Sequence, residues 1–297
     1  MKKVKLICDS TCDLLSGKLY GDENYRNLVT ERDVEYATLT VILNGVSYTE
    51  SKDIGVPELF EKIRATGGKP STAAVAPGIF VDIFSKYIDE GFDVVCITIG
   101  SKISGTFNSA TIARDLLGEK AESLFLVDGA NLSSGTGMVV LKACEFRDQG
   151  LSANEIQQKL IELVPKVKCQ FGISTLEYLY RGGRASGLSF FVSKFLRIKP
   201  ILVVRDGILK AGDKIIGKTE KTIQHQFEMF YKDYTNGLVD TENVFFTHCL
   251  APNLLLYAKS LFDSKGITVK NLFETEAGAV ISTHCGPGTL GIIYLLK

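Results

Sequence analysis

The sequence predicts an α/β fold in which a parallel sheet wrapped by helices carries a small β-insertion and is followed by a second, α+β domain with a mixed sheet. Three observations support this prediction. Buried-type strands such as Val94–Ile99 alternate with helical patterns as far as Pro165, which is typical of parallel sheets. Asn44-Gly45 joins two alternating runs and indicates a hairpin. From Gln170 onward, strands and helices no longer alternate simply.

The length supports the same division, because 297 residues exceed the usual size of a single domain. We expect an N-terminal α/β domain over residues 1–166, with the β-insertion at about 38–56, and a C-terminal α+β domain over residues 167–297. Either part is long enough to bury a core of its own.

Proline, glycine and capping residues place the helices of the N-terminal part. Pro57 opens a helix that ends at Gly67-Gly68, and Ser152-x-x-Glu155 is a capping box. An apolar stripe at helical spacing predicts another helix after Pro77. The expected strands are 4–8, 94–99 and 123–128; short or long helices are expected after Ser10, Pro57, Pro77 and Thr106 and before Gly150 and Pro165; residues 70–77 are expected to be an irregular link and 129–137 a glycine-rich loop.

The C-terminal part is expected to mix strand directions. It begins with a strand at Gln170 and the helical segment LEYLYRGGRAS, and a strand pair turns at Asp206-Gly207. Helix, strand, helix and strand follow. The chain ends in two apolar runs, 279–282 and 290–296, which are separated by THCGPGTLG.

The charge balance argues against several classes of function. Lys plus Arg number 34 and Asp plus Glu number 34 without a basic patch, so neither nucleic acid nor an anionic membrane surface is expected as the main partner. No run approaches the roughly 18 apolar residues of a membrane helix, and the apolar run at the start ends at Cys8, too early for a signal peptide. We therefore expect a cytoplasmic protein without a membrane span.

Cysteines and histidines do not indicate a metal or a disulfide framework. The seven cysteines, an odd number, show no C-x-x-C spacing, so reduced thiols in core positions are expected. The three histidines, His225, His248 and His284, are not paired with Cys or carboxylates at ligand spacing. Neither a metal nor a cofactor is expected.

The loop after the central strand opens a helix and carries three hydroxyl groups. The free N–H groups and the positive dipole end of that helix, with Ser101, Ser104 and Thr106, suit a small anion or a carboxylate. Asp9 and Asp128, at the ends of other predicted strands, fall at the same sheet edge. A Ser or Thr that simply caps the helix would give the same pattern, and this stretch alone leaves both interpretations open.

Residues 212–219 match the P-loop pattern G-x-x-x-x-G-K-T, which would make the protein a nucleotide hydrolase acting through Lys218. Their context argues against this function. A P-loop follows a buried strand, whereas the preceding DGILKAGD is typical of one arm of a hairpin. In addition, β-branched Ile215 and Ile216 resist the backbone turns of a phosphate nest.

Two other motifs could belong to a site. His284 lies in the loop HCGPG, whose glycines permit close approach of a ligand, although a tight turn with a hydrogen-bonded histidine fits equally well. His225 is expected to be solvated and His248 to be buried at a strand end. In RGGR, the simpler interpretation is a helix end with Gly182 in the left-handed cap position; alternatively, Arg184 offers a guanidinium fork for a carboxylate or phosphate.

Taken together, five segments resemble the DegV family of bacterial fatty-acid-binding proteins, which includes the acyl-binding subunits of fatty acid kinase. They are CDSTCDL at the start, ISGTFNSA, LEYLYRGGRAS, IKPIL with DG after it, and THCGPGTLG near the end. The resemblance covers nearly the whole length. Each segment alone is weak, but the set is specific.

The resemblance implies a long-chain, palmitate-like fatty acid buried between the two domains and a separate, ATP-binding kinase subunit as partner. It implies that Thr72 and Ser104 hold the carboxylate. The candidate ligand-binding residues are Thr72, Ser101, Ser104, Gly105, Thr106 and His284, with Arg184 for presentation to the kinase, and Leu188, Phe190, Phe191, Phe195 and Leu196 are candidates for lining an apolar tunnel. The family usually has T-S-Q-P where this chain has Thr72-Ala73-Ala74-Val75, which affects a neighbouring polar contact.

On this interpretation the protein is a carrier and not an enzyme. The alternative is a stand-alone enzyme, either an NTPase using Lys218 or a hydrolase using Ser104 with His284. No G-x-S-x-G elbow accompanies Ser104. The identity of the native ligand discriminates between these functions.

Overall fold

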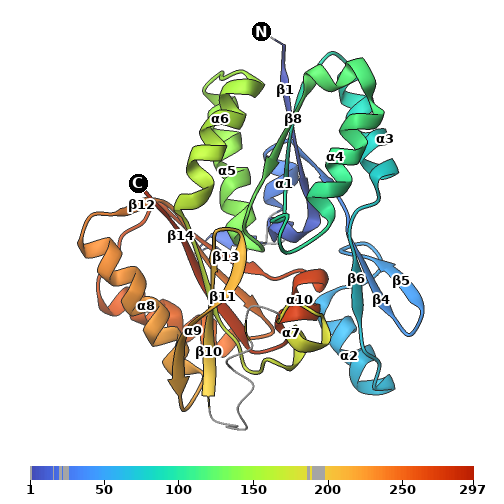
Figure 1. The fold of residues 1–297 in the computed structure, drawn as a ribbon. Helices are drawn as coiled ribbons and strands as arrows, with labels where there is room; N and C mark the ends of the chain where they lie inside the picture. Colours follow the sequence, from blue (N-terminus) through green and yellow to red (C-terminus); the bar gives the residue numbers. More distant parts are fainter. Residues whose placement is uncertain (1, 16, 20–21, 23–26, 186–187, 189–197) are drawn as a thin grey trace.

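The computed structural model, which describes residues 2–15, 17–19, 22, 27–185, 188 and 198–297, contains three β-sheets over those residues. In Figure 1 the four-stranded sheet occupies the upper part, the seven-stranded sheet lies below it, and the small three-stranded sheet lies at the lower right. The predicted fold class, α/β with a β-insertion and a second mixed sheet, is confirmed.

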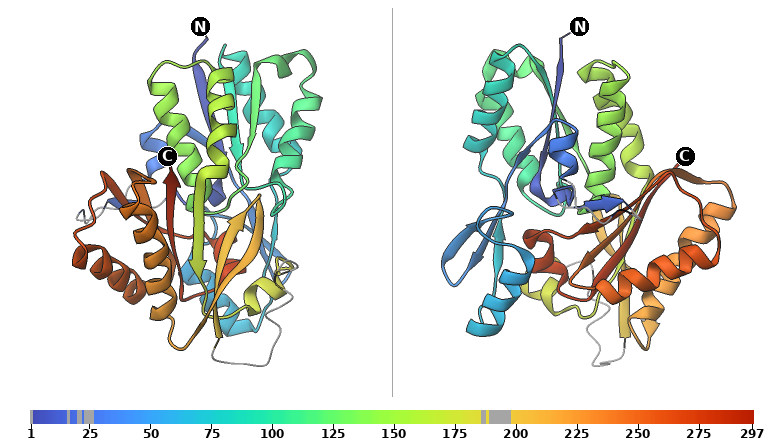
Figure 2. Two further views of the ribbon diagram at one scale, coloured as in Figure 1. Left: turned by 60° about the vertical axis from the view of Figure 1, so that its left-hand side comes forward. Right: turned by 180° about the vertical axis from the view of Figure 1, so that it is seen from behind.

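The four-stranded sheet is entirely parallel, in the order β3-β1-β7-β8. Residues 94–97 are fully buried, which explains why the central strand is a continuous apolar run. Figures 1 and 2 show α3 and α4 on one face of this sheet and α5 and α6 on the other. The bounds are β1 (Val4–Asp9), β3 (Val34–Ala37), β7 (Asp93–Thr98), β8 (Leu124–Asp128), α3 (Pro77–Asp89), α4 (Thr106–Leu116), α5 (Ser134–Asp148) and α6 (Ala153–Leu163).

Some local elements of this part differ from the predictions. The segment after β1 is a short 3-10 helix, η1 (Ser10–Cys12), capped by Asp9 and not by Ser10, because Asp9 Oδ1 accepts a hydrogen bond from Thr11 N at 3.0 Å. Helix α5 begins at Ser134, so Gly137 lies inside a helix and not in a loop. A Cβ on Gly137 would lie 2.5 Å from the carbonyl oxygen of Cys12, so the glycine permits close packing.

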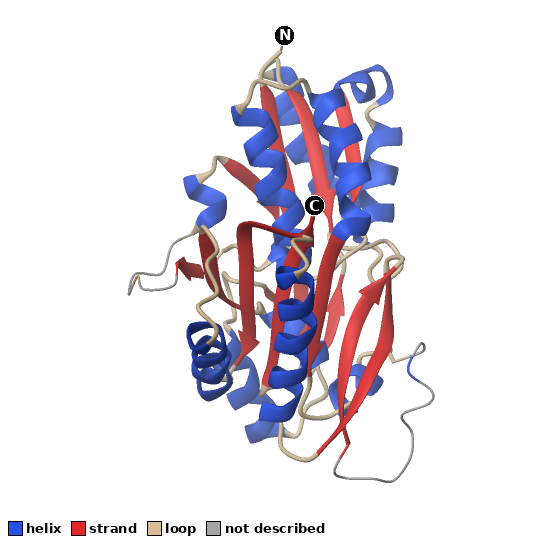
Figure 3. Cartoon of the chain, turned by 90° about the vertical axis from the view of Figure 1, so that its left-hand side faces the viewer, coloured by secondary structure: helices blue, strands red, loops and turns tan. Residues whose placement is uncertain are grey.

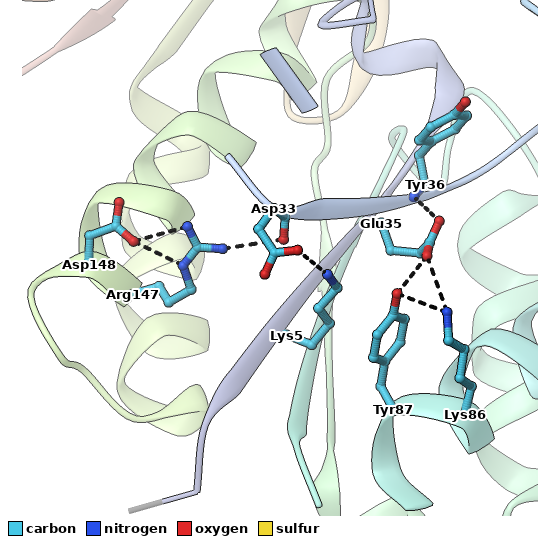
Figure 4. Close-up of polar contacts among 8 residues, drawn as sticks. All are labelled: Lys5, Asp33, Glu35, Tyr36, Lys86, Tyr87, Arg147 and Asp148. Atoms are coloured by element: carbon cyan, nitrogen blue, oxygen red, sulfur yellow. Dashed lines mark hydrogen bonds and ion pairs between the residues drawn. The ribbon is translucent and has the colours of Figure 1, made fainter. Parts of the chain in front are cut away.

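Edge strand β3, which was not predicted, is held by side chains from both neighbouring layers (Figure 4). Lys5 of β1 pairs with Asp33 at 2.6 Å, and Arg147 of α5 donates to the Asp33 carbonyl oxygen at 3.4 Å. On the other side, the hydroxyl of Tyr87 donates to Glu35 at 2.6 Å. A short strand without a clear periodic pattern is therefore stabilised by tertiary contacts, as is the adjoining α1 (Leu28–Glu31).

The β-insertion is a three-stranded antiparallel sheet. The predicted hairpin at Asn44-Gly45 is confirmed, since both residues have positive φ and join β4 (Thr40–Leu43) to β5 (Val46–Thr49). The expected irregular link is partly wrong, because β6 (Ser71–Ala73) pairs with β4 as a third strand. Helix α2 (Val56–Thr66), as predicted, ends at Gly67 in the left-handed conformation.

The seven-stranded sheet is mixed, in the order β11-β10-β9-β14-β12-β13-β2. Alternate residues of its strands face two cores: Tyr294 packs beneath α8 and α9, whereas Ile293 faces the other apolar cluster. Figure 3 shows this sheet below the parallel sheet. The bounds are β2 (Gly17–Leu19), β9 (Val167–Gly172), β10 (Ile198–Arg205), β11 (Ile208–Ile216), β12 (Val239–Cys249), β13 (Asn271–Glu276), β14 (Thr289–Leu296), α7 (Glu177–Arg181), α8 (Glu220–Thr235), α9 (Pro252–Ser264) and α10 (Ala279–Cys285), with 3-10 helices η2 (Gly118–Ser123) and η3 (Val164–Lys166).

Two features bear on the domain division. The expected boundary at residues 166 and 167 falls at the start of β9, and it stays a prediction. Strand β2, from the N-terminal part, pairs with β13 at the edge of the seven-stranded sheet, so the chain crosses between the two parts before the β-insertion.

The apolar run 279–282 forms helix α10 and not a strand. In the part of the chain that the structure describes, no helix is long and apolar enough to cross a membrane.

Candidate functional site

An apolar cavity lies where the carboxyl edge of the parallel sheet, the small sheet, α10 and the inner face of the seven-stranded sheet meet. About 940 Å³ of it is free of atoms, including open solvent at the mouth. Its described lining is apolar for the most part, with polar groups gathered at a few positions. The lining includes Thr72, Ala74, Ile99, Ile103, Ser104, Gly105, Leu132, Cys169, Phe171, Leu179, Arg184, Leu209, Thr247, Cys249, Val280, Ile281, His284, Cys285, Thr289, Gly291 and Ile293.

The structure brings Thr72 and His284 together from distant parts of the sequence. Thr72 Oγ1 of β6 lies 2.9 Å from His284 Nε2 at the end of α10. Burial and, to a lesser extent, the charge of Arg184 lower the pKa of His284 to about 4. His284 is therefore neutral at pH 7, and the positive charge on this part of the cavity wall comes from Arg184.

The hydrogen-bond partners of His284 determine what Thr72 can offer to a ligand. His284 Nδ1 is buried and has no partner among the described atoms. Because a buried N–H without an acceptor is rarely tolerated, we assign the ring proton to Nε2. His284 then donates to Thr72 Oγ1, and Thr72 retains its own proton. Thr72 can donate that proton to an acceptor in the cavity, such as a carboxylate.

Gly182, the first glycine of RGGR, makes room for the His284 ring. A Cβ at this position would lie 2.0 Å from His284 Nδ1, which no side chain could occupy without displacing the ring. The predicted left-handed cap is wrong for Gly182, which has φ −80°, and the left-handed residue is Gly183 with φ 70°. Arg184 Nη1 donates to the Gly182 carbonyl oxygen at 2.7 Å, and its Nε donates to that of Ile103 at 3.4 Å.

The loop before α4 contributes only part of its predicted hydroxyl groups to the cavity. Ser104 and Gly105 line it. Ser104 Oγ lies 3.0 Å from Thr106 Oγ1 and accepts from Thr106 N at 3.3 Å, so Ser104 also satisfies the first turn of the helix. Thr106 is buried behind it. Ser101 is exposed and donates through its backbone N to Asp128 at 2.9 Å.

The departure from the family pattern leaves a small apolar residue beside the polar end of the cavity. Ala74 lines the cavity, and its Cβ lies 3.8 Å from where a Cβ of Gly105 would be. Val75 is buried in the core. The chain therefore places a methyl group where a polar side chain would offer a further hydrogen bond.

Only one of the five apolar residues expected to line a tunnel lies within the described chain. Phe190, Phe191, Phe195 and Leu196 lie outside the described residues, and Leu188 is a buried core residue. The described lining includes alternate residues of β9 and β14, three consecutive residues at the end of β12 (247–249) and residues of α10. The period-2 pattern of these strands was readable, but it does not say which of the two faces borders a cavity.

The contacts of the candidate residues do not support the enzyme alternatives. Residues 212–216 lie in strand β11, where 214–216 pair with β10 and 212–213 lie at a register shift of the same ladder, so they form no phosphate-binding loop. His225, expected to be solvated, lies 2.6 Å from Asp213, and His248 is buried as predicted. Among the described residues, His284 Nε2 bonds with Thr72 and Ser104 with Thr106, so no Ser–His pair is formed.

Comparison with known proteins agrees with this geometry. The family model described as "Uncharacterised protein, DegV family" matches residues 3–297. A DegV domain-containing protein of Clostridium acetobutylicum is 34% identical over 302 residues, covering 100% of both chains. This chain belongs to the DegV family. The resemblance inferred from the five sequence segments is thereby confirmed.

Solved structures of DegV proteins show the same fold. A DegV family protein from Thermus thermophilus, whose structure is reported with fatty acid binding, is 27% identical, with a TM-score of 0.86 over 99% of this chain and 100% of that chain. The fatty acid kinase B3 protein of Streptococcus pneumoniae, loaded with linoleic acid, gives a TM-score of 0.81 at 18% identity over 99% and 100% of the two chains. At that identity, the second similarity concerns the fold alone.

Proposed function

We propose that this protein binds one long-chain fatty acid in the cavity between the two sheets and presents its carboxylate to a separate kinase subunit for acyl-phosphate formation. The Thr72–His284 pair carries the proposal. It places a hydroxyl donor on the wall of a mainly apolar cavity, with Ser104 and the Arg184 charge also on that wall. This combination suits a molecule with one anionic end and a long apolar remainder.

The energetics assign different roles to the two ends of such a ligand. Burial of a sixteen-carbon chain contributes on the order of 10 kcal/mol at ~0.8 kcal/mol per methylene, before ordering costs. A hydrogen bond to the carboxylate adds ~1.5–3 kcal/mol. The acyl chain therefore supplies most of the affinity, and Thr72 and Ser104 orient the carboxylate.

Mass spectrometry of a solvent extract from the purified protein tests the binding step. We expect a long-chain fatty acid at close to one molecule per chain. An extract that contains only nucleotide, or nothing, from a protein that also fails to take up added fatty acid would refute the proposal. Because the cavity wall is apolar over most of its area, we expect a long acyl chain, as in palmitate.

Presentation to a kinase is assigned to Arg184. Within the described part of the chain, its hydrogen bonds to the carbonyl oxygens of Gly182 and Ile103 use two of the five guanidinium donors, and it lines the cavity. A phosphoryl group arriving at the carboxylate brings several negative charges, which a guanidinium stabilises better than neutral hydroxyl groups do.

The Arg184→Ala variant separates binding from presentation. We expect it to keep most of the fatty acid affinity while acyl-phosphate formation with a cognate kinase subunit and ATP slows sharply. Arg181→Ala is the matched control, since Arg181 pairs with Glu177 on α7 and is exposed. Equal losses of binding and turnover would make Arg184 a simple anchor, and no loss in either would leave it a helix-end residue.

A further inference from the structure

Helix α10 is held at both ends by hydrogen bonds to side chains from the N-terminal part of the chain. At its last turn, His284 bonds with Thr72 of the small sheet. At its first turn, Glu50 Oε1, just after β5, accepts from Val280 N at 2.7 Å, and Asp13 Oδ1, just after η1, accepts from Gly278 N at 2.9 Å. Both acids come from the N-terminal part of the chain, whereas α10 belongs to the C-terminal part.

The two carboxyl groups are buried and close together. Asp13 is 3% exposed and Glu50 is 1% exposed. Their other oxygens accept hydrogen bonds from the hydroxyls of Ser133 and Ser10. A Cβ on Gly278 would lie 2.5 Å from Glu50 Oε1 and 3.5 Å from Asp13 Oδ1, so these oxygens lie within about 6 Å of each other. Glycine at 278 is what lets both acids reach the helix.

A helix as short as α10 depends on such contacts for its position. Ala279–Cys285 spans seven residues, and isolated helices of this length are unstable in water. Carboxyl oxygens at a helix N-terminus satisfy its free N–H groups, whether or not the carboxyl group is ionised. Because Val280, Ile281 and His284 line the cavity, a shift of α10 changes the cavity wall and the Thr72–His284 contact together.

We propose that Asp13 and Glu50 are positioning residues that hold α10 in the register at which His284 meets Thr72, and thereby maintain the site that receives the carboxylate. This inference rests on the proposed function, since it concerns the same site. It assigns a role to the start motif CDSTCDL, whose second aspartate is Asp13. Neither acid lines the cavity: Glu50 reaches it through α10, and Asp13 reaches it through α10 and through Ser133, which is a lining residue.

The arrangement makes the anchor sensitive to pH. The titratable groups that face the pair are Asp9 and the thiols of Cys169 and Cys285. Burial raises the pKa of Cys169 to about 12, and a hydrogen bond with Cys249, together with burial, raises the pKa of Cys285. Ionisation of both Asp13 and Glu50 places two negative charges together in a buried space. Raising the pH from 6 to 8.5 should therefore loosen α10 and weaken the binding of a fatty acid.

Titration calorimetry with a long-chain fatty acid, between pH 6 and pH 8.5, tests the inference. We expect Glu50→Ala to lower the affinity roughly tenfold at pH 6, as one lost hydrogen bond would, and Glu50→Gln to recover most of that loss. In the Asp13→Asn/Glu50→Gln double variant the fall in affinity between pH 6 and pH 8.5 should disappear. Glu61→Gln, on the exposed surface of α2, is the matched control.

A double-mutant cycle shows whether the effect passes through the histidine. In a His284→Ala background, Glu50→Ala should cost little further affinity, whereas an independent role would give additive losses. NMR signals of the His284 ring should shift in Glu50→Ala and return in Glu50→Gln, with or without a ligand. If Glu50→Ala does not fold, the pH profile of the double variant still tests the proposal.

The outcomes are distinguishable. If the parent protein binds a fatty acid and Glu50→Ala binds it equally well with an unshifted His284 signal, the positioning role is refuted and the proposed function stands. If the parent binds no fatty acid, the proposed function is refuted. The proposed role of Asp13 and Glu50 in maintaining the site for the ligand carboxylate is then refuted as well. If the affinity of the Asp13→Asn/Glu50→Gln variant falls between pH 6 and pH 8.5 as much as that of the parent does, the inference is also contradicted.

Discussion

At the residue scale, the hydrogen bonds of His284 and Ser104 determine which groups the cavity wall can offer to a ligand. The low pKa of His284 makes its ring neutral at pH 7, and with the ring proton assigned to Nε2 it orients the Thr72 hydroxyl and does not supply charge. Ser104 Oγ lies 3.0 Å from Thr106 Oγ1 and accepts from Thr106 N, so its own proton is available to a ligand while its oxygen keeps the bond to Thr106 N. The interpretation of Ser104 as the helix cap is wrong, because the N-cap residue of α4 is Gly105 and no side chain caps it, and the contact of Ser104 with a ligand stays a prediction.

Loss of either hydroxyl should weaken binding without unfolding the protein. Thr72→Val removes the donor and keeps the shape, and Ser104→Ala removes the second hydroxyl. Since a hydrogen bond to a charged group contributes ~1.5–3 kcal/mol, each change should lower fatty acid affinity roughly ten- to hundredfold. Calorimetry measures this loss, and circular dichroism checks folding. Unchanged affinity in both folded variants would place the carboxylate elsewhere.

A methyl group on Gly182 should reproduce the loss of His284. Gly182→Ala puts a Cβ 2.0 Å from the present position of His284 Nδ1, so the ring must leave Thr72. We expect fatty acid affinity to fall about as far as in His284→Ala. Gly78→Ala is the control, because nothing lies within 4 Å of that Cβ and the position is helical. Normal affinity in a folded Gly182→Ala protein would contradict the steric role.

At the element scale, a motif is informative only in the secondary structure where it occurs. The letters G-x-x-x-x-G-K-T match a phosphate-binding loop, but residues 214–216 pair with β10, and residues 212–213 lie at a register shift within the same strand pair. The backbone N–H groups of a strand point alternately to its two sides, so they cannot converge on one phosphate. The Ile215 and Ile216 side chains, which argued against a nest, are those of an ordinary strand.

ATP with Mg²⁺ should consequently leave the thermal stability of this protein unchanged. Because Lys218 has no phosphate nest beside it, Lys218→Ala should melt as the parent does, with and without the nucleotide. Differential scanning fluorimetry is the measurement. An ATP-dependent increase in melting temperature that Lys218→Ala abolishes would restore the nucleotide-hydrolase alternative.

At the scale of the whole molecule, buried titratable groups couple stability to pH in opposite directions. Burial raises the pKa of Asp13 to about 8 and that of Glu50 to about 7, from ordinary values of 3.8 and 4.5. Their stabilising contribution is present at low pH and is lost as the pH rises through these values. Burial lowers the pKa of His248 and His284 to about 4, so their contribution is present above pH 6.5 and is lost on acidification.

Melting temperature should therefore change little between pH 4.5 and pH 6.5, where the two effects oppose each other, and fall between pH 6.5 and pH 8. The Asp13→Asn/Glu50→Gln variant should lack the fall above pH 6.5 and should instead gain stability from pH 4.5 to pH 6.5, because these two acids no longer oppose the contribution of the histidines. Calorimetric melting across this pH series tests both signs. Identical curves for the variant and the parent would show that these acids are not buried in the folded state.

Local chemistry determined much of the fold from the sequence alone. The hairpin at Asn44-Gly45, the capping box at Ser152 and Glu155 and the buried central strand each depend on a few neighbouring residues, and all three are confirmed. Thr72 and His284, which form a hydrogen-bonded pair in the cavity wall, were predicted from two separate motifs. The family resemblance is what gave those motifs a function.

Only the tertiary structure decided how those pieces combine. Periodicity does not reveal that β6 pairs with β4 or that β2 joins the seven-stranded sheet. Nor does it reveal that the missing side chain of Gly182 leaves room for the ring of His284, 102 positions later. Likewise, the burial that neutralises His284 and raises the pKa of Asp13 and Glu50 comes from atoms far away in the chain. Hydrogen-bond partners and desolvation are properties of a packed neighbourhood, which a linear pattern does not contain.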